Sequence, residues 1–254
     1  MDEEIITEDE ITTERTPAEL IKWVESKLDA VASTDSGEKT IRLRQGLAKQ
    51  LVEEVYPLAI FASKKYGETN LVHIKPIIGN QNYDAILTDN SYSPASVSYV
   101  EVTQAHEGET EYLRAIHLQE HGYVPGIGTV KKEGTKKTGL RVSAQPEAVS
   151  VDSVAGSELQ KIVDAIGRKE GKSYPDNTCL VIKFDDGYMF RRAADGTTID
   201  RFVHDKIVGR ALHFNEICLV GKFKEVFRQY DLICNSGQVA CVVPKQPSNQ
   251  GRTS

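Results

Sequence analysis

The stretch that decides the fold runs from Tyr83 to Gln104 and reads YDAILTDNSYSPASVSYVEVTQ. Its first part, Tyr83 to Thr88, and its last part, Val97 to Thr103, have the apolar and β-branched pattern typical of strands. The segment between them, Asp89 to Pro94, is polar and ends in proline, as loops often do. The sequence therefore predicts two neighbouring strands joined by a loop.

Two acidic residues fall on these strands. Asp84 lies near the start of the first strand, and Glu101 lies within the second. Side chains alternate along a strand, so Glu101 and Thr103 share one face while Val100 and Val102 share the other. If the two strands pair antiparallel and in register, the carboxylates of Asp84 and Glu101 converge.

A carboxylate in the middle of an apolar strand needs a partner, because burying an unpaired charge is unfavourable. Mg²⁺ or Mn²⁺ would be one such partner, since both ions prefer oxygen ligands, and Asp84 and Glu101 would hold the ion. An arginine would be another, and Arg114 on the following helix is the candidate. The residues alone leave the metal site and the salt bridge both open.

Further helices and strands are expected on both sides of this stretch. Before it, we predict a helix starting at Thr16, a long helix from about Glu38 to Tyr66 with a break at Pro57, and a strand from Leu71 to Ile78. After it, we predict helices at about 108–120, 155–170 and 199–212, and strands at 178–184, 216–220 and 226–234. This order predicts an α/β fold with a three-stranded antiparallel start and later strands reached by crossovers.

Composition divides the chain into three parts. Residues 1–15 are acidic and rich in threonine, and we expect a flexible arm. Residues 16–240 are predicted to form a single α/β domain, and residues 241–254 a disordered polar tail.

Charge and composition narrow the class of protein. A net charge of −6 and a pI of about 5.6 weigh against nucleic-acid binding over the whole surface, but not against a local basic groove. The N-terminus lacks signal-peptide features, and no apolar stretch is long enough to span a membrane. The four cysteines include no Cys-x-x-Cys pair and indicate reduced thiols rather than a zinc site. We therefore expect a soluble, cytoplasmic protein without membrane contacts.

The opening stretch resembles the PD-(D/E)xK restriction-endonuclease-like superfamily. Tyr83-Asp84-Ala85 resembles the acidic position on the family's second strand, and Glu101-Val102-Thr103-Gln104 resembles the motif on its third. The resemblance covers roughly residues 38–122, with 178–184 as the later strand. It implies a restriction-endonuclease-like core over residues 36–122, with an N-terminal helical extension and an insertion over residues 123–153. It also implies metal-assisted hydrolysis of phosphodiester bonds in nucleic acid.

The resemblance also implies roles for individual residues. Asp84 and Glu101 would hold one or two Mg²⁺ or Mn²⁺ ions, and Glu53 or Glu54 would match an acidic helix residue that many members have. Thr103, however, stands where the family usually has a lysine. That lysine helps to position the attacking water and to stabilise the transition state.

Three interpretations of the missing lysine are open. Gln104 would contribute if the strand bulges or ends there. A lysine could arrive from elsewhere, for example Lys49 or Lys169, or the site no longer turns over. His106, just beyond the motif, is a candidate general acid/base or metal ligand, and the alternative is a helix-start residue without a chemical role.

Basic residues supply candidate contacts to a nucleic-acid backbone. Lys131, Lys132, Lys136 and Lys137 form a basic run that would neutralise phosphates without reading sequence. Arg114 would add a phosphate contact from its helix. The alternative for the lysine run is a solvated loop or hairpin tip.

Asp185-Asp186-Gly187 follows the apolar strand at 178–184. Paired aspartates at the end of a strand would suit a metal ion. Asp-Gly is also a common turn signal, and we expect a turn here.

The leading functional prediction is a metal-dependent nuclease, or a degenerate relative of one. The alternative is a non-catalytic binding or assembly protein, either a homodimer or a subunit of a larger complex. The acidic pI and Thr103 favour the alternative. The mid-strand carboxylate and the order of the strands favour the nuclease.

Overall fold

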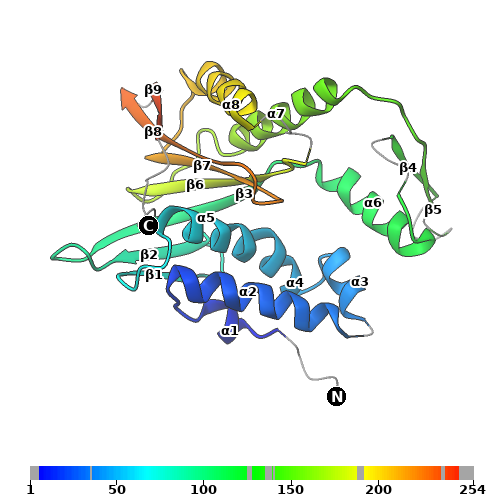
Figure 1. Cartoon of the computed structure of the whole chain (residues 1–254), viewed down its shortest axis with the longest axis horizontal. Coiled ribbons are helices and arrows are strands. Elements are labelled where there is room, and N and C mark those ends of the chain that lie inside the picture. The colour runs from blue at the N-terminus through cyan, green and yellow to red at the C-terminus, as the bar shows by residue number, and fades with distance from the viewer. Residues whose placement is uncertain are drawn as a thin grey trace, which may run out of the picture.

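A seven-stranded mixed β-sheet forms the centre of the fold (Figure 1). The structure is a computed structural model that describes residues 6–34, 36–124, 128–134, 139, 141–187, 192–235 and 238–245. The strands, in their order across the sheet, are β1 (Val72–Pro76), β2 (Ala85–Asp89), β3 (Ser96–Gln104), β6 (Thr178–Phe184), β7 (Glu216–Gly221), β8 (Phe227–Asn235) and β9 (Gln238–Lys245). This is the α/β architecture that the sequence predicts.

Pairing is antiparallel at both ends of the sheet and parallel in its middle. The β1–β2, β2–β3, β7–β8 and β8–β9 pairs are antiparallel, while β3–β6 and β6–β7 are parallel. Parallel neighbours need crossover connections, because the chain must return to the same end of the sheet. The helices α6 (Gly108–His121) and α7 (Val151–Gly167) lie in the first crossover, and α8 (Arg192–Ile207) lies in the second.

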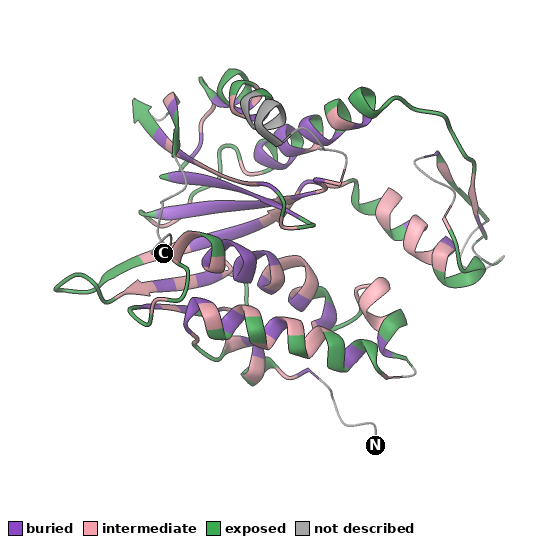
Figure 2. Ribbon diagram, viewed as in Figure 1, coloured by how far each residue is buried: buried purple, intermediate pink, exposed green. Residues whose placement is uncertain are grey.

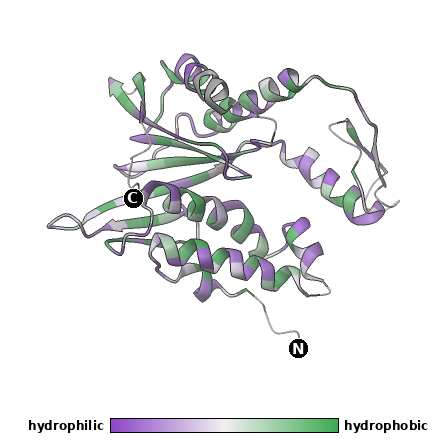
Figure 3. Cartoon of the chain, viewed as in Figure 1, coloured by the Kyte–Doolittle hydropathy of each residue, from purple (hydrophilic) through white to green (hydrophobic). Residues whose placement is uncertain are grey.

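Helices cover both faces of the sheet. The helices α2 (Pro17–Ala32) and α5 (Tyr56–Tyr66) lie on one face, and α7 and α8 lie on the other (Figure 1). Figure 2 shows the buried residues concentrated on the central strands, and Figure 3 shows that these strands are largely hydrophobic. Within the described part of the chain, no helix is both long and apolar enough to cross a membrane.

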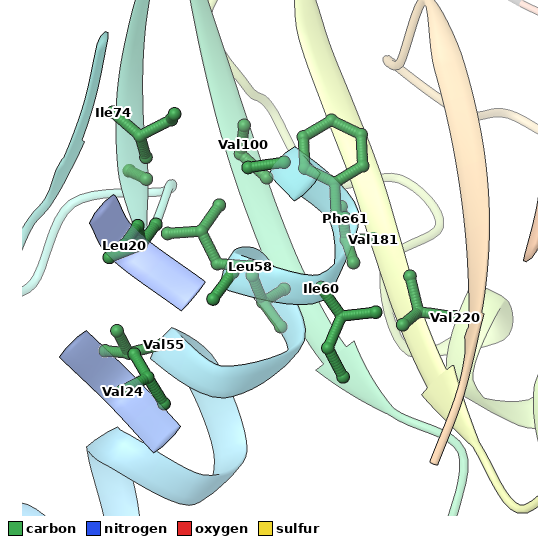
Figure 4. Close-up of a cluster of buried hydrophobic side chains, with 14 of the residues drawn as sticks. Leu20, Val24, Val55, Leu58, Ile60, Phe61, Ile74, Val100, Val181 and Val220 are labelled. Carbon is green, nitrogen blue, oxygen red and sulfur yellow. The ribbon is translucent and has the colours of Figure 1, made fainter. Parts of the chain in front are cut away.

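The core has two halves because successive strand residues point to opposite faces. Val181 packs with Leu58 and Phe61 in the half beneath α5 (Figure 4). Leu180, its neighbour on β6, packs with Ile162 in the half beneath α7. The central strands are thus buried on both faces, which explains their continuous apolar runs.

The N-terminal segment is more ordered than the sequence suggests. Residues Glu8–Thr12 form α1, which starts with a capping box between Thr7 and Glu10, and its Ile11 is 1% exposed. The prediction of a flexible arm over residues 1–15 is therefore wrong from residue 6 onward, and the first five residues lie outside the described part. A threonine followed three residues later by glutamate was the available signal.

The long helix predicted from Glu38 to Tyr66 is interrupted earlier than expected. It consists of α3 (Gly37–Arg42), α4 (Leu47–Gln50), the π-helical turn η1 (Leu51–Val55) and α5. The break falls between α3 and α4, where Arg44 and Gly46 have φ values of 51° and 52°. Pro57, the predicted break, lies in the first turn of α5 directly after the π-helical turn, where a missing main-chain N–H is tolerated.

Strands also form in the 123–153 segment, where the sequence left a loop or a hairpin open, and in the predicted tail. The 123–153 insertion holds a hairpin of β4 (Val130–Glu133) and β5 (Arg141–Ala144), which lies beyond α6 and apart from the main sheet (Figure 1). The prediction of a disordered tail over residues 241–254 is wrong up to residue 245, because β9 pairs with β8 there. Residues 246–254 lie outside the described part.

Asp186 ties the end of β6 to the turn between β7 and β8. Its carboxylate accepts hydrogen bonds from the main-chain N–H groups of Phe223, Glu225 and Val226 at 2.8, 3.0 and 3.0 Å. Gly221 faces it so closely that a Cβ there would lie 1.9 Å from Asp186 Oδ2. Asp186 is 3% exposed, and these contacts give it a structural role in holding a turn.

We expect Asp186→Ala to lower the free energy of unfolding by about 3 kcal/mol, because it removes a buried acceptor shared by three main-chain N–H groups, of which that of Val226 is buried. Urea unfolding would measure the change. Asp185→Ala is the matched control: it removes a 3.2 Å ion pair with the exposed Lys222 and one N–H contact from Gly187, so we expect a loss of about 1 kcal/mol or less. Equal losses in the two variants would contradict the structural role of Asp186.

Candidate functional site

The candidate site begins where β2 and β3 separate. Their pairing ends at Ala85 and Val100, while β3 continues to Gln104 along β6. Asp84 fills the gap: its N–H donates to Val100 O at 2.8 Å, and its Oδ2 accepts from Val102 N–H at 2.7 Å. The Asp84 carboxylate thus accepts from the main-chain N–H of Val102, which lies beyond the end of the β2–β3 pairing.

Glu101 lies beside Asp84 on β3 and is 9% exposed. Its Oε1 is 2.5 Å from Nζ of Lys169, a residue that follows α7. The ion-pair partner of Glu101 is therefore Lys169. The sequence had suggested Arg114 instead. Arg114 instead donates to the main-chain oxygen of Gly128.

Acidic side chains crowd this position. Burial, followed by the charge of Glu101, raises the pKa of Asp84 to about 7. Burial also raises the pKa of Glu54 on η1, and the charges of Glu53 and Glu101 raise it further. Lys169 acts in the opposite direction on both Asp84 and Glu54. The site thus holds more acidic groups than its nearby lysine can balance.

Asp84 and Glu101 are the residues best placed to hold a hard metal ion. Mg²⁺ and Mn²⁺ take oxygen ligands, and Mg²⁺ usually keeps several waters beside one or two carboxylates. Among the described residues, the one group of three or more ligating side chains whose ligand atoms all lie within 4.8 Å of one another is elsewhere, on β6 and β7. An ion at the candidate site would therefore be held by a carboxylate pair, completed by water.

Thr103 and Gln104, the predicted substitutes for the motif lysine, have different surroundings. Both line a hollow of about 220 Å³ that also exposes Glu53, Glu54 and Arg168. The Gln104 side-chain amide donates to the main-chain oxygen of Glu53, which holds η1 against the end of β3. Gln104 therefore has a positioning role, and only Thr103 shares the Glu101 face of the strand.

His106 joins a short polar chain beside this hollow. Its Nε2 lies 3.3 Å from Nη1 of Arg44, which is 2.7 Å from Oε1 of Glu53. Burial, followed by the charge of Arg44, lowers the pKa of His106, so the neutral imidazole accepts from the guanidinium and carries its proton on Nδ1. That Nδ1 is buried without a partner among the described residues.

A cleft runs along the carboxyl ends of β3 and β6, where α/β sheets commonly bind ligands. It comprises three hollows of about 170, 320 and 220 Å³, all lined by His106. Its basic lining residues are Arg42, Arg44, Lys49, Lys161, Arg168, Lys183 and Lys222. Some are paired with acids, as Lys161 is with Glu158 at 2.6 Å. Its acidic lining residues are Glu53, Glu54, Glu111, Glu158 and Asp185, so basic side chains are in slight excess along the cleft.

Sequence reasoning missed the deepest of these cations, Lys183. Burial, followed by the charges of Arg44 and Lys222, lowers the pKa of Lys183 to about 8. A lysine inside the apolar run 178–184 was the available signal, since such a residue needs a polar outlet. The structure supplies this outlet at the cleft.

The predicted nucleic-acid contacts lie apart from the carboxylates. Lys131 and Lys132 are exposed on β4, and Nζ of Lys132 is 3.9 Å from Oε1 of Glu109. Lys136 and Lys137 lie outside the described residues. The β4–β5 hairpin adjoins α6 and is not part of the main sheet (Figure 1).

Comparison with known proteins adds no relative. No family model, no curated protein and no solved structure matches the chain.

Asp84→Asn should stabilise the metal-free protein at high pH. The pKa of Asp84 is about 7 in the folded state and about 3.9 in an unfolded chain, so stability falls as pH rises from about 4 to 7. An asparagine keeps an acceptor for Val102 N–H without this penalty. We expect a gain on the order of 2 kcal/mol at pH 8 and none at pH 4, measured by urea unfolding in a chelator. Parallel pH profiles for the two proteins would contradict the raised pKa.

Proposed function

We propose that the protein is a metal-dependent nuclease of the PD-(D/E)xK restriction-endonuclease-like type, with Asp84 and Glu101 as the metal-holding pair. The observation that carries the proposal is the ion pair of Lys169 with Glu101, directly beside Asp84. The family motif has a lysine near its paired carboxylates, and this chain has Thr103 at that position. Lys169 is therefore the candidate replacement.

The order of elements supports the proposal. A helix, three antiparallel strands, a helical crossover and a parallel strand follow one another as α5, β1, β2, β3, α6–α7 and β6. This is the order that the resemblance implies. Glu54 on η1 adds support, because its electrostatic coupling to Asp84 and Glu101 corresponds to the acidic helix residue of many family members.

Each residue has a defined task in the proposed reaction. A bound Mg²⁺ or Mn²⁺ would lower the pKa of a coordinated water and offset charge on the phosphate. Lys169 would leave Glu101 and orient the attacking water or the scissile phosphate through its Nζ. Thr103 would hold this water through its hydroxyl, and Gln104 would keep η1 in place.

The basic cleft supports binding of a phosphodiester chain. Lys183, Lys161 and Arg44 lie along it and would neutralise phosphates, with affinity falling as salt rises. The exposed Lys131 and Lys132 would extend this contact from the β4–β5 hairpin. A cleft of this kind suits a polyanion even in a protein of net charge −6.

The second candidate is a non-catalytic binding or assembly protein, acting as a homo-oligomer or a subunit of a larger complex. The specific observation in its favour is Thr103 at the lysine position of the motif. On this view the Lys169–Glu101 pair is a structural salt bridge, and the surrounding acids have no metal.

Cleavage of mixed DNA and RNA substrates with Mg²⁺ or Mn²⁺ tests the proposal. We expect Glu101→Gln and Lys169→Met each to lower the rate at least a hundredfold, because each removes a group that acts on the reacting phosphate or water. Lys172→Met, an exposed lysine three residues further on, is the matched control and should change the rate less than twofold.

A melting experiment separates the two candidate functions. The nuclease proposal expects Mn²⁺ to raise the melting temperature of the wild-type protein and not that of Glu101→Gln. If neither ion supports cleavage and neither raises the melting temperature, the binding or assembly function is the better account.

A further inference from the structure

A second cluster of ligating side chains lies on the other face of the central strands. Cys179 on β6 is in register with Glu216 on β7, and Cys218 follows two residues later on the same face. These thiols belong to the core half beneath α5. Glu101, by contrast, alternates with Val100, which belongs to that same half, so its side chain points the other way. The two clusters are thus separated by the thickness of the sheet.

Distances within this cluster match a tetrahedral thiolate site. The Sγ atoms of Cys179 and Cys218 are 3.7 Å apart, and Cys218 Sγ is 3.4 Å from Glu216 Oε1. Zinc–sulfur bonds of about 2.3 Å and zinc–oxygen bonds of about 2.1 Å at tetrahedral angles give edges of about 3.8 and about 3.6 Å. The ligand atoms of all three residues lie within 4.8 Å of one another.

We propose that Cys179, Cys218 and Glu216 form a binding site for a thiophilic divalent cation, with Zn²⁺ as the natural occupant. This site differs from the carboxylate pair in its ligand chemistry, since sulfur selects zinc over magnesium. It does not rest on the nuclease proposal. Sequence spacing gave no hint of it, because the two cysteines are 39 residues apart.

Charge balance allows the site to exist with and without the cation. Without it, two neutral thiols lie beside the ion pair of Glu216 with Lys65. Lys245 lies 3.7 Å from Oε1 of Glu216, and its charge is balanced by Asp231 at 2.6 Å. With it, two thiolates and a carboxylate carry three negative charges, which Zn²⁺ and Lys65 balance. Binding releases both thiol protons, and the buried site stays neutral in either state.

The site also has an entrance and room for a fourth ligand. A cavity of about 290 Å³ is lined by Cys179, Glu216 and Lys65, together with Tyr66 and Asp89. A zinc ion with three protein ligands takes a water or another small ligand as its fourth. The cavity lies at the amino ends of β6 and β7 and reaches Cys179 and Glu216, two of the three proposed ligands.

Cobalt titration of the reduced, metal-free full chain tests the site. The double variant Cys234→Ser/Cys241→Ser leaves Cys179 and Cys218 as the only cysteines without altering the core. We expect Co²⁺ to give a sulfur-to-cobalt charge-transfer band and intense visible bands, saturating at one equivalent and abolished by Zn²⁺. Weak visible bands alone, as for oxygen-bound cobalt, would overturn the proposal.

Three further variants in this background assign the ligands. Cys218→Ser should remove or weaken the charge-transfer band. Glu216→Gln should weaken Zn²⁺ affinity at least tenfold. Glu101→Gln should leave the cobalt spectrum unchanged, which separates this site from the carboxylate pair. An unchanged spectrum in Cys218→Ser would overturn the assignment. If Cys218→Ser fails to fold, the spectrum of the double variant decides.

Discussion

The parallel pairing of β3 with β6 is the constraint on which the candidate site depends. Two parallel strands cannot be joined by a tight turn, so the chain must leave β3, cross the sheet and return to the same end. The crossover contains α6, the β4–β5 hairpin and α7. Its return to β6 carries Lys169 to the carboxylate of Glu101. The topology thus brings together two residues that are 68 positions apart in the sequence.

Local pattern predicts the carboxylate pair but not its surroundings. Asp84 and Glu101 become neighbours through alternation and antiparallel register, which are short-range properties of two strands joined by a loop. Lys169 was one of several candidate lysines, because its position depends on the length and path of the crossover. Arg114 was the predicted ion-pair partner of Glu101, but it donates to the main-chain oxygen of Gly128 in the segment after α6. Long-range pairing of this kind has no periodic signal in the sequence.

The predictions of disorder at the two ends of the chain also fail because they neglect long-range contacts. An acidic, threonine-rich segment suggests disorder, but its Ile11 is buried and its capping box satisfies the helix start. The C-terminal residues look polar as a group, yet Val239 and Val242 are buried where β9 pairs with β8. In both cases one or two apolar side chains decide the structure. Average composition conceals them.

The electrostatics of the Asp84 region resemble those of a site kept for function rather than stability. Burial, and after it the charges of neighbouring acids, raises the pKa values of Asp84 and Glu54. Replacing such a group by a neutral isostere ordinarily improves folding, so this arrangement favours the proposed metal site over a purely structural role. The Cys179 cluster follows a different principle, because its charges balance within the core. Strand alternation makes both arrangements possible in neighbouring strands: β3 presents Glu101 to one face of the sheet, and β6 presents Cys179 to the other. If both proposals hold, a hard and a soft cation are kept apart by a single layer of backbone, and each is selected by the atoms on its own side.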